Sequence, residues 1–379
     1  MNQEPIKVLH MTKLGAGGIS SLTISINKCI DLTKVVFDYL VFEDVETFYE
    51  KEVYALQGKK QIVDVSKCKN KLYLYWRKYC GVKRLLKRES YDVVHVDAST
   101  PMDVVIGMAA KAAGVKTIII HSHIAGDNKH TRARDIYLQV CRNAMIGVFS
   151  HYFAISKESA DFMFPKRIIK NNNYIIYKNG IMAERYCYNA KTRNETRKQL
   201  EIDNKFVLGH VGRFSKEKNH LFLIDVFSKV AMEKKDAVLL LVGMGQEKEV
   251  VEAYVRKLGL TKKVIFYGVS RDVPRLLLAM DAFIFPSKYE GLGIVAIEAQ
   301  CSGLRTYCSP GIPEEANITD LFIKFDNYNA DTWAKQILQD IEDCLGIRTD
   351  RIDEIKEAQF DILDVAKRLE RFYIEQTLK

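Results

Sequence analysis

The segment Asp281–Gly303, DAFIFPSKYEGLGIVAIEAQCSG, decides the fold of this chain. It begins with a short apolar strand, Ala282–Phe285, passes through a turn that contains two glycines, and ends in a helix over Ile294–Cys301. A strand, a glycine loop and a helix start in this order bring unpaired backbone N–H groups and the positive helix end to the carboxyl edge of a parallel sheet. The segment therefore predicts a phosphate-binding edge in an α/β protein.

Two carboxylates flank this loop. Glu290 precedes the glycines, and Glu298 follows eight residues later on the predicted helix. Eight residues are a little over two helical turns, so we expect Glu298 to face broadly the same side as the loop. A bare pair of glutamates at this spacing is better explained as two solvated side chains. The proline, the Gly-x-Gly turn and the apolar helix face around this pair favour a functional role.

The stretch PSKYEGLGIVAIEA closely resembles the E-x7-E signature of retaining glycosyltransferases of family 4, which have the GT-B fold. The resemblance implies an α/β protein of two Rossmann-like, doubly wound domains that face a central cleft. It also implies that Glu290 contacts the sugar or supports charge at the reacting carbon, and that Glu298 accepts hydrogen bonds from the ribose. The backbone N–H groups expected to hold sugar and phosphate oxygens belong to Gly291, Leu292, Gly293 and Ile294.

Three further elements of the second half resemble the same family. Arg213 and Lys218 match its G-R-x-x-x-x-K element after the strand Phe206–Val211, and they would neutralise the charge that grows on the leaving diphosphate. Gly243 lies in a V-G-x-G turn that resembles a family turn. The turn at Gly268 and Val269 follows a strand that, in the family, receives the nucleotide base.

The first half opens with another strand, glycine loop and helix. The strand Ile6–Met11 is followed by Gly15-Ala-Gly-Gly18 and then by an apolar helix. This is not G-x-G-x-x-G, so it does not predict a dinucleotide site. The resemblance places Gly17 and Gly18 near the donor phosphates and the acceptor. A tight turn without a ligand is the alternative.

Two histidines follow the apolar strand Lys116–Ile120. His121 and His123 stand at the carboxyl end of this strand, where active sites of α/β proteins lie. In the family a histidine after this strand contacts the donor sugar, and we therefore predict both as catalytic candidates without choosing between them. A metal bound by the H-x-H pair is a further possibility, but no third ligand is evident nearby and the family implies no metal.

The length of 379 residues suits two domains, each with its own core. We predict an acceptor-side domain over residues 1–185 and a donor domain over 186–359, with a C-terminal helix at about 360–379 that packs back on the first domain. The chain has no apolar run of membrane-span length, no signal-peptide pattern and no C-x-x-C pair among its eight cysteines. These features predict a cytoplasmic protein.

A basic segment lies between Lys67 and Arg88. It contains nine Lys or Arg residues and no acidic residue, interleaved with aromatic and leucine side chains. A helix of this kind can lie on an anionic membrane surface or hold phosphates. The alternative is a solvated helix whose apolar side chains face the core. Nucleic acid is not favoured, because no nucleic-acid-binding motif accompanies the charge.

These expectations combine into one function. The sequence predicts a retaining, metal-independent hexosyltransferase that uses a nucleotide diphosphate sugar, expected to be a UDP-sugar, and needs no cofactor. The expected acceptor is a glycan, lipid-linked, in exopolysaccharide or capsule synthesis at the cytoplasmic membrane face. Two alternatives remain: a GT-B nucleotide-sugar epimerase that works without an acceptor, and a non-catalytic donor-binding partner subunit.

Overall fold

The computed structural model describes residues 4–15, 17–124, 126, 131–343 and 348–378. The chain divides into two compact units. The first contains Met1–Gly180 and Gln359–Lys379, and the second contains Ile181–Ala358. The first division thus falls after residue 180, whereas the sequence analysis placed it after residue 185.

The first unit contains a seven-stranded parallel sheet in the order β3-β2-β1-β4-β5-β6-β7. Its strands are β1 Ile6–Met11, β2 Val35–Val41, β3 Lys60–Ile62, β4 Val93–Ala98, β5 Thr117–Ser122, β6 His151–Ala154 and β7 Ile175–Ile176. The central strands β4 and β5 are buried along their whole length. Burial of every residue along a strand is typical of parallel strands that are covered on both faces.

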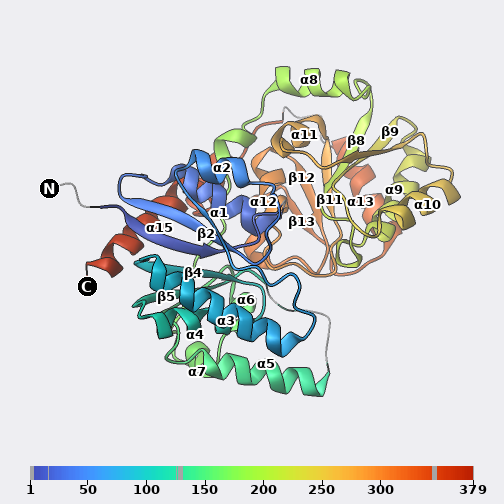
Figure 1. Ribbon diagram of the computed structural model, residues 1–379. Helices are drawn as coiled ribbons and strands as arrows, with labels where there is room; N and C mark the ends of the chain where they lie inside the picture. The colour runs from blue at the N-terminus through green and yellow to red at the C-terminus, as the bar shows by residue number, and fades with distance from the viewer. Residues whose placement is uncertain (1–3, 16, 125, 127–130, 344–347, 379) are drawn as a thin grey trace. The chain divides into compact units, whose positions relative to one another are not determined.

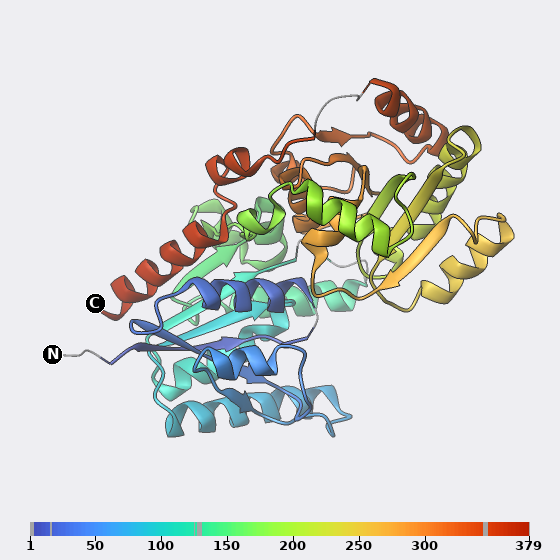
Figure 2. The same cartoon turned by 90° about the horizontal axis from the view of Figure 1, so that it is seen from above.

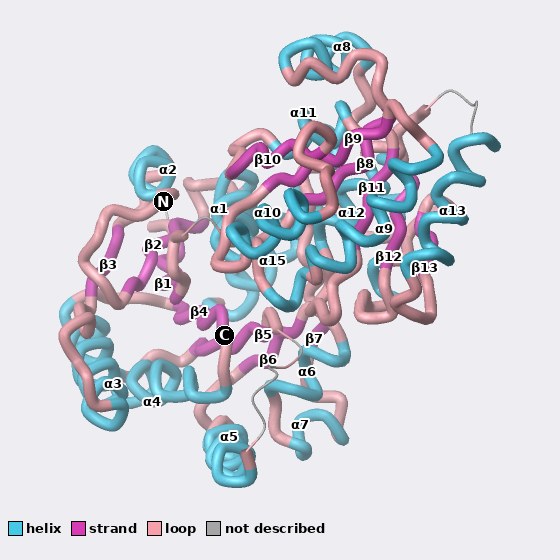
Figure 3. Tube along the Cα trace, turned by 90° about the vertical axis from the view of Figure 1, so that its right-hand side faces the viewer, coloured by secondary structure: helices cyan, strands magenta, loops and turns pink. Residues whose placement is uncertain are grey.

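Helices cover both faces of this sheet. They are α1 Gly18–Cys29, α2 Glu50–Ala55, α3 Lys71–Arg88, α4 Val104–Ala113, α5 Arg132–Ala144, α6 Lys157–Met163, α7 Lys166–Lys170 and α15 Ile362–Thr377. α3, α4 and α5 lie on one face, and α1 and α15 lie on the other (Figures 1 and 3). The last helix, drawn in red, belongs to the unit that contains the N-terminus (Figure 2).

The second unit contains a six-stranded parallel sheet in the order β10-β9-β8-β11-β12-β13. Its strands are β8 Phe206–Val211, β9 Ala237–Val242, β10 Val264–Gly268, β11 Ala282–Phe285, β12 Arg305–Cys308 and β13 Phe322–Lys324. The helices are α8 Ala190–Gln199, α9 His220–Glu233, α10 Lys248–Lys257, α11 Val273–Ala279, α12 Ile294–Cys301, α13 Ala330–Asp343 and α14 Ile352–Glu357. α9 packs against α10 and α13, and α11 packs against α8.

Both sheets reverse their strand order beside their first strand. In the first sheet the chain runs outward from β1 through β2 to β3 and then returns to β4 on the other side of β1. In the second sheet it runs outward from β8 through β9 to β10 and then returns to β11 on the other side of β8. Ligands of open α/β sheets bind outside the carboxyl ends of the strands at such a reversal. The topology therefore defines one candidate edge in each unit.

The C-terminal helix predicted at about 360–379 corresponds to α15, Ile362–Thr377. A separate short helix, α14, precedes it. Between the two helices Gln359 takes a left-handed conformation (φ 60°), and Asp361 caps α15 by accepting a hydrogen bond from the Leu363 N–H.

Candidate functional site

Lys218 and Glu290, two site residues predicted from the sequence, lie close together where the strand order of the second sheet reverses. Lys218 ends a 3-10 turn after β8, and Glu290 lies in the loop after β11. The Nζ atom of Lys218 is 2.5 Å from Oε1 of Glu290, and both side chains are largely shielded from solvent. Backbone hydrogen bonds fix the two loops to their neighbours: the Lys288 N–H donates to the Glu217 carbonyl at 2.7 Å, and the Glu290 N–H donates to the Gly311 carbonyl at 3.1 Å.

The helix that follows this loop begins without a side-chain cap. Gly293 is the N-cap residue of α12 and takes a left-handed conformation (φ 80°) that favours glycine. Gly291 and Leu292 form the turn before it, and Ile294 is the first helical residue. The first N–H groups of a helix have no partner inside it. This helix start is therefore able to bind an anion.

Glu298 lies within α12. Its carboxyl group is held by a hydrogen bond from a residue that was not predicted from the sequence. The Tyr186 hydroxyl donates a hydrogen bond of 2.6 Å to Oε1 of Glu298. Burial raises the pKa of Glu298 to about 7, against the lowering effect of the Tyr186 hydrogen bond. Burial, and then the charge of Glu298, raise the pKa of Tyr186 well above its ordinary value, so the tyrosine stays a donor. No local pattern links these two residues.

Arg213 is exposed just beyond β8 and is not part of the Lys218–Glu290 pair. Gly243 lies at the end of β9, where its N–H donates to the Gly268 carbonyl at 2.8 Å. A Cβ atom on Gly243 would lie 2.0 Å from the carbonyl oxygen of Gly212, so the fold itself requires glycine there. A Cβ atom on Gly268 would meet nothing within 4 Å, and the following Val269 is exposed.

In the first unit, the glycine loop after β1 leads directly into α1. Gly17 is the extended N-cap residue of α1 and Gly18 is its first residue. Neither has a positive φ, and a Cβ atom on Gly15, Gly17 or Gly18 would meet no atom within 4 Å. The chain itself thus has no steric need for these glycines. Backbone left bare in this way suits the close approach of a ligand.

The two predicted histidines belong to a larger buried cluster. His121 is the second-last residue of β5, and His123 follows that strand, so the strand extends further than predicted. The strand register sets Asp97 of β4 beside His121, and His10 of β1 beside His95 of β4. Because side chains alternate along a strand, the residues two apart point to one face. The four histidines and Asp97 are each less than a tenth exposed.

Burial shapes the charges of this cluster. It lowers the pKa of His95 and of His121 well below the ordinary value, and the neighbouring histidines act in the same direction. Burial alone would raise the pKa of Asp97, but contacts with His10 and His123 hold it well below its usual range. His95 and His121 are therefore neutral imidazoles beside an ionised Asp97 carboxylate.

The same cluster could hold a metal ion. Within the described residues, two sets bring their ligand atoms within 4.8 Å of one another: His10, His95 and Asp97, and Asp97, His121 and His123. In the sequence no third ligand was evident near the H-x-H pair. The sheet supplies one, because Asp97 lies on the neighbouring strand β4.

α3 carries the predicted basic segment and begins after Asn70, whose side chain accepts from the Tyr73 N–H. Its N-terminal half exposes Leu72 and Trp76, which are 79% and 57% accessible. An apolar hollow beside them is lined by residues of α3 and α4, among them Trp76 and Met108. The exposed basic side chains of α3 are Lys71, Arg77, Arg84, Lys87 and Arg88. Within the described part of the chain, no helix is both long and apolar enough to cross a membrane.

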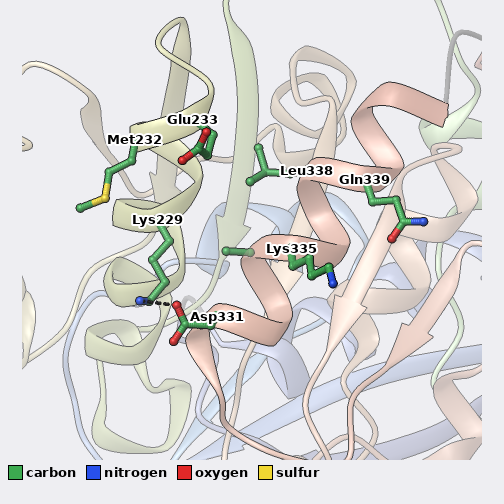
Figure 4. A pocket seen from close by; sticks show the side chains of 8 residues that line it. Lys229, Met232, Glu233, Asp331, Lys335, Leu338 and Gln339 are labelled. Carbon is green, nitrogen blue, oxygen red and sulfur yellow. Dashed lines mark ion pairs between the residues drawn. The ribbon is translucent and has the colours of Figure 1, made fainter.

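A second hollow lies between α9 and α13 (Figure 4). Lys229 and Asp331 form an ion pair of 2.6 Å at one end of it, and Met232 and Leu338 contribute apolar surface. None of the site residues predicted from the sequence lines this hollow. It therefore adds nothing to the candidate chemistry.

Comparisons with known proteins connect the chain to glycosyltransferases. Residues 192–357, most of the second unit, match the model of the family described as glycosyl transferases group 1. The chain is 27% identical over 321 residues to the putative glycosyltransferase EpsF of Bacillus subtilis, which covers 84% of this chain and 82% of the relative. It is 26% identical over 234 residues to the UDP-Gal:alpha-D-GlcNAc-diphosphoundecaprenol alpha-1,3-galactosyltransferase of Escherichia coli, over 58% of each chain.

Solved structures show the same fold over the whole chain. The UDP-glucose complex of Alr3699/HepE from Anabaena superposes with a TM-score of 0.77 at 19% identity, covering 97% of this chain and 99% of the other. Sucrose-phosphate synthase from Thermosynechococcus elongatus superposes with a TM-score of 0.76 at 15% identity, covering 98% of each. The predicted fold, two Rossmann-like α/β domains of the GT-B type, is confirmed.

Proposed function

We propose that this protein is a retaining glycosyltransferase that moves a hexose or N-acetylhexosamine from a UDP-sugar to a lipid-linked glycan acceptor in exopolysaccharide or capsule synthesis. The observation that carries the proposal is the edge of the second sheet, where Lys218 pairs with Glu290 in front of the uncapped start of α12. The similarity of the chain to EpsF and to the undecaprenol-linked galactosyltransferase supports the reaction class and the kind of acceptor.

The donor diphosphate would lie against this edge. The helix start and Lys218, with Arg213 nearby in sequence, supply positive charge where negative charge grows on the leaving nucleotide. The site therefore needs no metal ion at the diphosphate. Glu298 is oriented by Tyr186, and its carboxylate would accept hydrogen bonds from the ribose hydroxyls.

The chemistry itself needs no covalent nucleophile from the protein. The bond between the anomeric carbon and the diphosphate oxygen breaks, and the acceptor hydroxyl forms the new bond on the same face of the sugar. The acceptor proton passes to the departing diphosphate. Glu290 would support the charge at the anomeric carbon, and it is poised for this by its ion pair with Lys218. His121 or His123 would contact hydroxyls of the donor sugar.

A lipid-linked acceptor requires access to a membrane, and α3 suits that task. Its exposed Leu72 and Trp76 can enter the lipid interface, while its exposed basic side chains meet anionic head groups. Peripheral binding at the inner face of the plasma membrane would then bring the acceptor to the first unit.

The first experiment incubates the purified protein, in the presence of a chelator, with a panel of nucleotide sugars and measures thermal stabilisation and nucleotide release. One UDP-sugar should stabilise the fold and release UDP slowly in the absence of acceptor. Conversion of the donor into an isomer would instead establish an epimerase. Stabilisation without any turnover, with acceptor lipid present, would establish a donor-binding subunit, and no stabilisation by any donor would refute the site.

A further inference from the structure

Helix α5 has apolar side chains on two different sides. Leu138 and Cys141 are 3% and 8% exposed and face the interior of the first unit. Ile136, Tyr137 and Val140 are 67%, 45% and 60% exposed. Because residues three and four positions apart are neighbours on the surface of a helix, these three side chains form one stripe that meets solvent. A helix that only covers a core keeps its apolar side chains on the inner side, so this second stripe needs a separate explanation.

The exposed stripe of α5 continues onto the neighbouring helices. α4 packs against both α3 and α5, and the three helices lie on one face of the first sheet (Figure 3). Trp76 of α3 and Met108 of α4 are 57% and 40% exposed, and both line the apolar hollow between their helices. Tyr137 of α5 also lies near Tyr75 of α3, since the pKa of Tyr75 is raised to about 12 by burial first and then by the charges of Asp103 and Tyr137.

These exposed apolar side chains together form what we call the outer helix surface. It consists of Leu72 and Trp76 of α3, Met108 of α4, and Ile136, Tyr137 and Val140 of α5. Monomeric soluble proteins rarely expose large contiguous apolar patches, and those that exist mark a contact with another protein or with a membrane. The charge around the patch distinguishes between these two partners.

The helices that carry the outer helix surface have a strongly one-sided charge. α3 contains seven Lys or Arg residues and no acidic residue, and α4 contains one Lys and no acidic residue. α5 contains three Arg residues and one Asp. Helices with this charge are attracted to the anionic head groups of a lipid bilayer. Their exposed apolar side chains can then enter the boundary between the head groups and the acyl chains.

A second copy of this chain fits the outer helix surface less well. In a symmetric dimer the same patch of both subunits meets across the axis, so the positively charged helices would face one another. Like charges opposed across an interface are unfavourable and suppress pairing. An anionic bilayer complements both the apolar stripe and the positive charge.

We propose that α5 enters the interface of an anionic membrane with its stripe of Ile136, Tyr137 and Val140, while the basic side chains of α3 bind the lipid head groups. The membrane contact proposed above for α3 is then one edge of a broader surface in which α5 provides much of the apolar area. Tyr137 suits the depth of the head groups, because its ring is apolar and its hydroxyl is polar. The reason for the contact, a lipid-linked acceptor, rests on the proposed function, whereas the contact of α5 with lipid does not.

The first test measures binding of the full-length protein to vesicles by co-sedimentation. The vesicles contain either phosphatidylcholine alone or equal parts of phosphatidylcholine and phosphatidylglycerol. Ile136→Ser combined with Val140→Ser should lower the partition coefficient on the anionic vesicles by about tenfold or more, since two aliphatic side chains no longer leave water. Both positions are exposed, so the melting curve of the variant should match that of the unaltered protein.

Leu363→Ser is the matched control. Leu363 is an apolar side chain of the same unit and is 45% exposed, but it lies on α15, which covers the other face of the sheet. Its substitution should change the partition coefficient by less than about twofold.

A second test locates α5 relative to the lipid. The chain has two tryptophans, of which Trp76 is exposed on α3 and Trp333 is fully buried in the second unit. Trp76→Phe combined with Tyr137→Trp moves the exposed fluorophore from α3 to α5. Lipids with brominated acyl chains should quench the fluorescence of this variant, whereas Trp76→Phe combined with Leu363→Trp should show no quenching.

The outcomes separate the inference from the proposed function. Vesicle binding that is insensitive to the double serine variant, or a fluorophore at position 137 that brominated lipids do not quench, would overturn the role of α5 even if Trp76→Ser weakened binding. Equal binding to neutral and anionic vesicles would overturn the role of the charge. A dimer in lipid-free solution that the double variant dissociates, without vesicle binding, would make a second copy the partner and overturn the proposal. Failure of every donor to bind would refute the proposed function and leave the vesicle results standing.

Discussion

Glu298 should make the stability of this protein depend on pH in an unusual direction. Burial raises the pKa of this carboxyl from 4.5 to about 7. Between these two values the unfolded chain releases the proton while the folded chain keeps it. The folded state then binds more protons, so the free energy of unfolding falls as the pH rises through this window. A buried acidic group that is paired with a cation usually has a lowered pKa, and the free energy of unfolding then rises with pH.

The size of the pKa change in Glu298 sets the size of the effect on the free energy of unfolding. One pKa unit corresponds to about 1.4 kcal/mol, so the full difference amounts to about 3 kcal/mol. The side chain of Glu298 retains some contact with solvent, and we therefore expect about 1 to 3 kcal/mol. Glu298→Gln keeps the shape and still accepts from the Tyr186 hydroxyl, but it cannot ionise. The variant and the unaltered protein should be about equally stable near pH 4.5, and the variant should be more stable at pH 8.

The assay is urea unfolding at a series of pH values from 4.5 to 8. The exposed Glu357→Gln serves as the control and should follow the unaltered protein. Tyr186→Phe removes the hydrogen bond that lowers the pKa of Glu298, so the midpoint of the pH-dependent loss should move to higher pH. Parallel stability curves for Glu298→Gln and the unaltered protein would refute the reasoning, since they would mean that the carboxyl ionises normally in the fold.

Three further predictions concern the donor loop, the fold and the membrane surface. Lys218→Ala should lower nucleotide release by about 100-fold, whereas the exposed neighbour Lys216→Ala should stay within about twofold in the same assay. Gly243→Ala should destabilise the protein by at least about 2 kcal/mol more than Gly259→Ala in urea unfolding, because only the former Cβ would collide with backbone. Trp76→Ser on α3 should reduce co-sedimentation with anionic vesicles, and unchanged sedimentation would refute the membrane role of this helix.

Local patterns in the sequence predicted the elements of the donor side closely. The strands β8 and β11 and the helix α12 have the predicted bounds, because each is a largely apolar segment flanked by glycine, proline or charged residues. Lys218 and Glu290 belong to two motifs that each follow the carboxyl end of a strand, but the ion pair between them was not predicted.

Contacts that depend on tertiary packing were not predictable in this way. Tyr186 reaches Glu298 from a short turn more than a hundred residues earlier, and nothing in its neighbourhood marks it. The same holds for Tyr373 on the last helix, whose hydroxyl lies 2.7 Å from Nδ1 of His95. His10, His95 and Asp97 did leave a signal, since each stands near the carboxyl end of an apolar strand. The strand order needed to bring those ends together is a property of the sheet and not of any segment.

The glycines fall into two groups, which differ in whether the fold itself requires them. Gly243 and Gly293 have positive φ and close backbone or ring neighbours, so a folded chain of this topology would need them without any function. Gly15, Gly17 and Gly18 have ordinary φ and open space where a side chain would stand. A side chain there would cost the isolated fold little, but it would cover the backbone at the edge of β1. Gly15, Gly17 and Gly18 therefore fit the proposed approach of a ligand, whereas the architecture alone accounts for Gly243 and Gly293.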